Sequence, residues 1–302
     1  MTVTQQSPGD VRILPEPIRT TARILRSFHH DLSTSPDAEV SEAPRLQSDV
    51  DEYLGDMLAA YGHAYQGLRS REPSQTAYNR LARHLLDEAH SSVGRIDRVV
   101  LAYALPDSQQ GYSVCASMVH SSPGLATAFA VSDQGVTSPF TALRVAGGTL
   151  RGDSGERALV IALDQGAIPW EPPPETPVPG RDLGAALLLG GEDPSRGGGL
   201  LHWQATPVDA TGAARAVEEV LADVRSRTPG PCTLVLGCRV PGPTAPGPEV
   251  TVLRAPSDLV CTAVWSRAHG AGIAHDGDPV VVVEYDPVLG YFCAVATGLE
   301  GQ

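Results

Sequence analysis

Side chains that could act as nucleophiles or bases gather in one short segment, residues 132–138. The candidates in and near this segment are Ser132, Asp133, Thr137, Ser138 and Cys115. Ser138 directly precedes Pro139, which is typical of the first turn of a helix, so we expect the Ser138 hydroxyl to cap that helix. Asp133 has the chemistry of a general base, but acids also favour turns, and the turn is the interpretation we prefer. The residue types alone leave the chemistry of the segment open.

Histidine and glycine patterns favour no bound cofactor. The 9 histidines have no spacing that identifies a general base or a metal site. Gly147 and Gly148, and the glycines at 197–199, lack the strand, loop and helix context of a phosphate-binding loop. We therefore expect no metal ion, no nucleotide and no other cofactor.

The strongly negative net charge limits which macromolecules can be binding partners. The formal net charge of the 302 residues is −13, and arginine supplies all the fixed positive side-chain charge because the chain has no lysine. Nucleic acid is therefore excluded as a partner, and long-range attraction to an acidic carrier protein is weak. A local cluster of arginines could still dock such a carrier, although we prefer to interpret these arginines as part of a solvated surface. The cluster consists of Arg69, Arg71, Arg80 and Arg83.

Apolar runs and cysteine usage predict a cytoplasmic protein. No apolar run approaches the ~20 residues of a membrane span, and the N-terminus lacks a basic and then apolar secretory pattern. The 5 cysteines form no C-x-x-C pair, and an odd number argues against a disulfide framework. We expect free and mostly buried thiols.

Hydrophobic periodicity in the first half of the chain alternates helices with short buried strands. Residues 1–50 are rich in proline, serine and acids, so we expect them to be partly irregular. We then expect helices at 54–65, 74–89, 113–120 and 138–146, and strands at 98–104, 127–131 and 158–163. Such alternation favours a largely parallel sheet with both faces covered.

The second half repeats the α/β pattern after a proline-rich connector at 168–180. Expected strands are 183–189, 200–206, 233–236, 280–285 and 291–296, with one helix at 211–227. We place the boundary inside the connector, so that the halves are 1–173 and 174–302. The proline-rich stretch at 241–248 suggests that a helical segment of the second half has been shortened.

In order along the chain, several motifs resemble the thiolase fold, and within it the β-ketoacyl-acyl-carrier-protein synthase III group and its polyketide relatives. The motifs are a Q-G-L-R-S-R turn at 66–71, A-L-P-D at 104–107, A-F-A-V at 128–131, R-D-L-G-A-A at 181–186 and G-D-P-V-V at 277–281. The resemblance runs from about Tyr61 to the C-terminus. It implies two similar α/β halves in an α-β-α-β-α layering.

The same resemblance places no nucleophile where the family has its cysteine. Counting forward from the 128–131 strand puts that position at Gly135, and counting back from the following helix puts it at Val136. We prefer Val136, because the polyketide pattern G-C-T-S-G-L-D-A then lies on residues 135–142 without a gap. A valine cannot accept an acyl group from a thioester.

The family's histidine and asparagine are also missing. Cys238 falls roughly at the histidine and Asp258 near the asparagine. Neither residue restores the chemistry, because a thiol is a poor substitute for an imidazole and a carboxylate repels an enolate oxygen. The resemblance thus implies a scaffold that has lost its condensing triad. A sulfur brought to the bend from another part of the molecule would overturn that conclusion.

Three functions remain open. The first is a non-condensing partner of a competent ketosynthase, like the chain-length factor of polyketide systems. The second is an acyl-thioester-processing enzyme, such as an acyltransferase, cyclase or hydrolase, that reuses the pocket. The third is a binding or scaffolding protein, retained for its surface and not for its pocket. Beyond a ketosynthase or a second copy, the resemblance implies an acyl carrier protein or an acyl-thioester as a partner. The family's dimers predict a seam at the 127–131 strand, formed with a ketosynthase or with a second copy.

Overall fold

The computed structural model describes residues 12–32, 44–62, 64, 78–107, 113–150, 155–166, 176–191, 199–275 and 277–299. The turn expected at 66–71, the residues expected to begin the 74–89 helix, and most of the 168–180 connector lie outside these ranges. Among the described helices, none is long and apolar enough to cross a membrane.

A five-stranded sheet has the order β2-β6-β5-β3-β4. Its strands are β2 (Ala22–Asp31), β3 (Arg98–Ala102), β4 (Thr127–Val131), β5 (Arg157–Asp164) and β6 (Leu183–Gly191). β3 pairs in parallel with both β4 and β5, whereas β6 is antiparallel to β5 and β2. The nearly continuous apolar sequences of β3, β5 and β6 are typical of strands covered on both faces.

A six-stranded sheet has the order β1-β7-β11-β10-β8-β9. Its strands are β1 (Ile18–Thr20), β7 (Leu200–Ala205), β8 (Cys232–Leu236), β9 (Val250–Arg254), β10 (Val280–Asp286) and β11 (Tyr291–Thr297). β10 and β11 form the expected antiparallel hairpin, and β8 is parallel to both β9 and β10.

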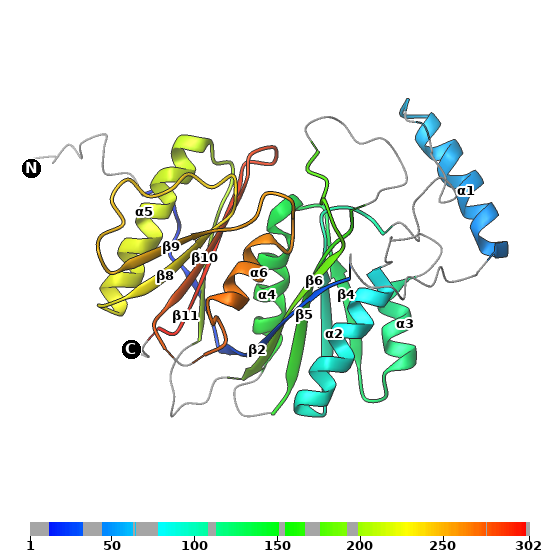
Figure 1. Cartoon of the computed structure of the whole chain (residues 1–302), viewed down its shortest axis with the longest axis horizontal. Coiled ribbons are helices and arrows are strands. Elements are labelled where there is room, and N and C mark those ends of the chain that lie inside the picture. Colours follow the sequence, from blue (N-terminus) through cyan, green and yellow to red (C-terminus); the bar gives the residue numbers. More distant parts are fainter. Residues whose placement is uncertain are drawn as a thin grey trace, which may run out of the picture.

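Helices cover the sheets in layers (Figure 1). Between the sheets lie α4 (Ser138–Thr149) and α6 (Ala263–Gly270), whose apolar side chains share one buried core with both sheets. The outer face of the five-stranded sheet packs on α2 (Tyr78–Val93) and α3 (Val114–Ser121), and that of the six-stranded sheet packs on α5 (Ala210–Arg227). α1 (Pro44–Ala59) lies apart from both sheets. This is the predicted α-β-α-β-α layering.

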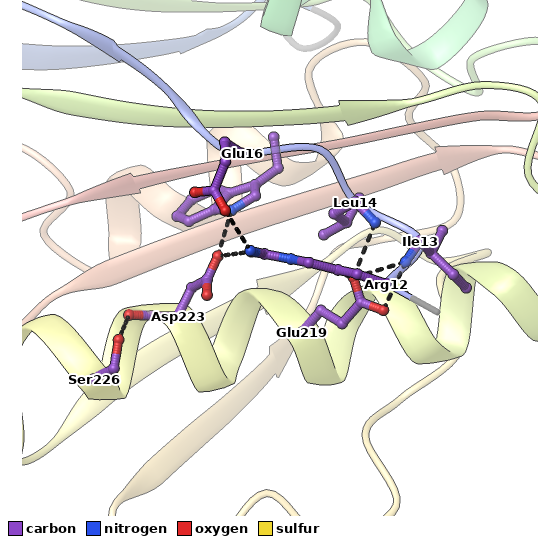
Figure 2. Close-up of polar contacts among 8 residues, drawn as sticks. Arg12, Ile13, Leu14, Glu16, Glu219, Asp223 and Ser226 are labelled. Carbon is purple, nitrogen blue, oxygen red and sulfur yellow. Dashed lines mark hydrogen bonds and ion pairs between the residues drawn. The ribbon is translucent and has the colours of Figure 1, made fainter. Parts of the chain in front are cut away.

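Within the N-terminal segment, residues 12–32 form strands and contacts that the composition did not predict. Leu14 is buried, and the backbone N–H groups of Ile13 and Leu14 donate to the carboxylate of Glu219 on α5 at 2.9 Å each. Figure 2 shows Arg12 reaching Glu16 and Asp223 above the same helix. Residues 18–31 then form β1 and β2, two strands that the sequence analysis did not predict.

Most of the expected strands are confirmed, but two expectations are wrong. The helix expected at 54–65 is α1, which ends at Ala59, and both sheets are mixed, because β2, β6, β1, β7 and β11 pair antiparallel. The structure adds β9 and α6. It also extends the 138–146 helix to Thr149, so Gly147 lies inside α4 and not beyond its end. The division into halves at 173/174 stays a prediction. Each half contributes a strand to the other half's sheet: β6, from 174–302, pairs within the five-stranded sheet, and β1, from 1–173, pairs within the six-stranded sheet.

Candidate functional site

The chain bends sharply between β4 and α4, as expected for the position of a lost nucleophile. After β4, Asp133 and Gly135 adopt left-handed backbone conformations with φ of 63° and 53°. A short 3₁₀ turn over Gly135–Thr137 leads directly into α4, where Pro139 sits in the first turn. Val136 lies on this turn and is 6% exposed.

The backbone of Val136 is held by an internal carboxylate. Its N–H donates to Oδ2 of Asp286 at 3.2 Å, and Oδ1 of Asp286 accepts from the N–H groups of Val288 and Leu289 at 3.0 Å each. Asp286 lies so close that a Cβ on Gly135 would come within 1.8 Å of Oδ2. An N–H group at a helix start is well placed to bind an oxyanion. Here that donor is already used.

A sulfur does lie at the bend, and the sequence analysis did not identify it. The thiol of Cys261, from the segment before α6, donates to the carbonyl oxygen of Gly135 at an Sγ to O distance of 3.6 Å. Cys261 is 0% exposed, and burial, followed by the charge of Asp164, raises its pKa well above the usual value. A sulfur from another part of the molecule therefore lies at the bend, which is the condition given above for overturning the lost-nucleophile conclusion. Burial and a raised pKa make this thiol a poor nucleophile, and the loss of the nucleophile stays a prediction.

Asp164, at the end of β5, fixes the backbone around Cys261. Its carboxylate accepts from the N–H groups of Val260, Cys261 and Thr262 at 2.8, 2.9 and 2.9 Å. It also accepts from the Thr262 hydroxyl at 2.6 Å. Burial raises the pKa of Asp164, while these hydrogen bonds act in the opposite direction. The contacts indicate a rigid clamp between β5 and the start of α6.

A second buried acid lies against Gly237, the residue before Cys238. Glu284 on β10 is 4% exposed, and a Cβ on Gly237, just after β8, would lie 1.9 Å from its Oε1. Burial raises the pKa of Glu284 to about 8, so the group is mostly protonated at pH 7. Its carboxyl accepts from the N–H of Tyr285 at 3.0 Å.

The two replacements predicted for the histidine and asparagine lie at the surface. Cys238 is exposed, and partial burial raises the pKa of its thiol. Asp258 accepts a hydrogen bond from Arg181 at 3.0 Å and is half exposed. Their proposed correspondence with family residues stays a prediction.

The remaining candidates around the bend have local roles. Ser138 is fully buried and donates to the carbonyl of Gly135 at 3.0 Å, so the prediction that it caps α4 is wrong. Thr137 donates to the carbonyl of Gln134 at 2.7 Å. Asp133 is a turn residue in the left-handed region, in line with the interpretation preferred for it.

Cys115, on α3, and Ser132 complete the set. Cys115 packs with the core on the outer face of the five-stranded sheet, whereas Val136 belongs to the core between the sheets. Burial raises the pKa of Cys115. Ser132 donates to Asp133 at 3.4 Å. No role in catalysis follows from either position.

The acidic and thiol groups around Val136 are closed off from solvent. Cys261, Asp164, Glu284 and Asp286 are each at most 4% exposed. Within the part of the chain that the structure describes, no three histidine, cysteine or acidic side chains are arranged to hold a metal ion. Among the described residues at the bend, the N–H of Val136 is bound to Asp286 and the thiol of Cys261 is buried.

Comparison with known proteins identifies the fold. No family model and no curated protein matches the chain. Among solved structures, 3-oxoacyl-(acyl carrier protein) synthase III, FabH, from Pseudomonas aeruginosa PAO1 is similar over 93% of this chain and 98% of its own, with 18% identity and a TM-score of 0.58. A variant of OleA from Xanthomonas campestris matches over 94% and 99% of the two chains, with 12% identity and a TM-score of 0.56.

A polyketide enzyme is similar to a comparable degree. The priming β-ketosynthase of the R1128 polyketide biosynthetic pathway matches over 97% of this chain and 100% of its own, with 15% identity and a TM-score of 0.55. These likenesses confirm the fold that the motifs predicted. The chain has the thiolase-type fold of the ketosynthase III structures.

Proposed function

We propose that the protein is a non-condensing ketosynthase homologue that acts as a partner subunit of a competent ketosynthase in polyketide or fatty-acid-like biosynthesis. The observation that carries the proposal is Val136 at the bend, with its N–H bound to Asp286. A condensing enzyme needs a nucleophile there and a free donor for the oxyanion, and this chain has its own side chains in both places.

The edge of the five-stranded sheet supports a partner. Among the described strands, β4 pairs with β3 alone, so its other side has backbone groups outside the sheet ladder, and Ala130 on it is exposed. An unpaired edge strand is a template for pairing with another chain. β4 also leads into the bend at Val136, so a partner on this edge would lie beside the site.

Co-expression tests the partner role. We expect the chain to co-purify with a polyketide ketosynthase and to change the length of its product. Ala130→Arg on the β4 edge should abolish co-purification, because an arginine there obstructs pairing. Val252→Arg is the matched control, since Val252 is also exposed on an edge strand, β9, of the other sheet. A chain that stays alone, or pairs only with itself, and leaves product length unchanged contradicts the proposal.

Acyl labelling tests the absence of condensing chemistry. The protein is incubated with an acyl-pantetheine thioester, and its intact mass is measured. We expect no adduct on the natural chain. An adduct on Cys238 or Cys261 of the natural chain would instead favour an acyl-thioester-processing enzyme.

A further inference from the structure

Four histidines form two pairs at the end of β2, one pair on each face of the strand. Successive residues of a strand point to opposite faces of its sheet, so His29 and His30 face different helices. The rings of His30 and of His84, on α2, lie with their centroids 3.7 Å apart and their planes tilted by 33°. The rings of His29 and of His269, on α6, are stacked with centroids 6.1 Å apart. The end of β2 therefore lies between imidazole pairs.

This end of β2 is at an edge of the five-stranded sheet. Among the described strands of that sheet, β2 pairs with β6 alone, and residues 29–31 lie opposite residues 183–185. Asp31 also forms an ion pair with Arg181. Because a single ladder of hydrogen bonds holds an edge strand, its end can detach while the rest of the sheet stays intact.

The surroundings of the two β2 histidines favour neutral rings. Burial, followed by the ring of His269, lowers the pKa of His29, and burial, followed by the ring of His84, lowers the pKa of His30. Nε2 of His29 is buried without a hydrogen-bond partner among the described residues, so protonation would leave a charged donor unpaired there. Because both pKa values are lowered by folding, the stability that the neutral rings contribute is complete above the unfolded pKa of about 6.5 and is lost as the pH falls below it.

The charged groups near these rings offset the effect only in part. Asp31 and Glu88 raise the pKa of His30, and Asp31 raises that of His29, whereas Arg181 and the ring of His30 lower that of His29. The neighbouring strand β6 has no titratable side chain. Two unit charges about 4 Å apart repel each other even in water, by an amount that corresponds to roughly a fivefold change in an equilibrium constant. Two protonated rings in the closer pair would therefore push each other apart.

We propose that the two histidine pairs form an acid-sensitive latch on the end of β2. Neutral rings pack against α2 and α6 and hold the strand. Proton uptake places like charges on facing rings and releases residues 29–31 from residues 183–185. Release would leave the start of β6 as an unpaired edge, which is a template for pairing with another chain. The latch lies at the opposite edge of the sheet from β4 and does not depend on the proposed function.

Hydrogen exchange of the full-length chain at pH 7.5 and pH 5.5 tests the latch, with rates corrected for the intrinsic effect of pH. We expect the amides of residues 29–32 that are protected at pH 7.5 to lose about fivefold or more of their protection at pH 5.5, while those of β5 keep theirs. The double variant His84→Gln with His269→Gln should remove most of this loss. Both positions are exposed on helices, so the β2 peptide that is measured keeps its sequence. His120→Gln, at an exposed position of α3, is the matched control and should follow the natural chain.

Ring titration by NMR gives a second readout. Because the ring of His84 lowers the pKa of His30, His84→Gln should raise the pKa of His30, whereas His120→Gln should leave it unchanged. A natural chain with equal protection of β2 at both pH values overturns the proposal. So does an equal loss of protection in the natural chain and the double variant, or a His30 titration that His84→Gln does not move.

Discussion

Asp164 and Glu284 are both buried acids near Cys261, and they differ in the hydrogen bonds they receive. Asp164 accepts from three backbone N–H groups and one hydroxyl. Glu284 accepts from its neighbour, the N–H of Tyr285, and faces Gly237 without a side-chain donor from β8. Burial raises the pKa of each, that of Glu284 to about 8, and the four hydrogen bonds to Asp164 oppose the rise there.

The difference shows what decides the role of a buried carboxyl group. Donors that surround a carboxylate compensate for its lost hydration, so Asp164 connects β5 to α6 as a structural clamp. A carboxyl group with few donors keeps its proton instead, which links folding to pH. Two acids near the bend at Val136 therefore act in opposite ways. The folded state depends on the carboxylate of Asp164, whereas it is more stable when the carboxyl group of Glu284 carries no charge.

The largest effect is expected from removing the clamp. Asp164→Ala leaves four donors without an acceptor, and we expect it to lower the free energy of unfolding by about 4 kcal/mol. Urea denaturation measures the loss. Asp258→Ala removes an exposed carboxylate that is paired with Arg181, and should cost below about 1 kcal/mol. Equal losses in the two variants would refute the clamp.

The next effect concerns Glu284 and pH. The pKa of Glu284 is about 8 in the folded chain and lower in the unfolded chain, so the folded state binds the additional proton. Its contribution to stability is complete below the unfolded pKa and is lost as the pH rises through about 8. Glu284→Gln should remove this pH dependence. At pH 9 its free energy of unfolding should exceed that of the natural chain by on the order of 3 kcal/mol.

Thermal or urea unfolding between pH 5 and pH 9 measures the linkage of Glu284. Glu88→Gln, an exposed helix position, is the control and should follow the natural chain. If the natural chain and Glu284→Gln keep a constant difference across this range, Glu284 does not hold its proton.

A smaller effect is expected from crowding Glu284. Gly237→Ala places a Cβ against Oε1, and we expect it to lower the free energy of unfolding by about 2 kcal/mol. Combining it with Glu284→Ala should recover most of the loss, which a double-mutant cycle measures. Gly270→Ala is the control, because a Cβ there meets nothing within 4 Å. Absence of coupling between Gly237 and Glu284 would argue against this packing.

The smallest effect is expected where carboxylates keep contact with water. Arg12 pairs with Glu16 and Asp223 on the surface of α5, as Figure 2 shows. Arg12→Gln should lower the free energy of unfolding by about 1 kcal/mol or less, and salt should weaken the effect. Arg26→Gln, at an exposed position of β2, is the comparison. A salt-independent loss above that of Asp164→Ala would reverse the order proposed here.

Local patterns predicted much of the fold. The apolar runs of β3, β5 and β10 and the helical periodicity of α2 and α5 act over a few residues, so they can be recognised without the rest of the chain. β1 and β2 escaped prediction because arginines and histidines interrupt their apolar pattern, and long-range pairing with β7 and β6 determines their structure. α6 is short, with little polar alternation, and is stabilised by burial between the two sheets.

The candidate site was predictable only in part. The motif at 135–142 located the bend, because the turn and the helix after it depend on residues close in sequence. Cys261 carried no signal of its own, since an isolated cysteine has no spacing to interpret. The role of Asp286 was likewise hidden, because this residue ends β10 just before a hairpin turn whose sequence is typical of a simple connection.

By itself, the sequence determined that a strand, a bend and a helix follow one another and that valine stands at the bend. Only the tertiary structure decided what surrounds that valine. Asp286 and Cys261 reach the bend from 150 residues beyond Val136 and 126 beyond Gly135, because strand order in the two sheets brings β10 and the start of α6 beside α4. Propensity and periodicity act between near neighbours, whereas contacts across such separations exist only once both sheets have closed around their common core.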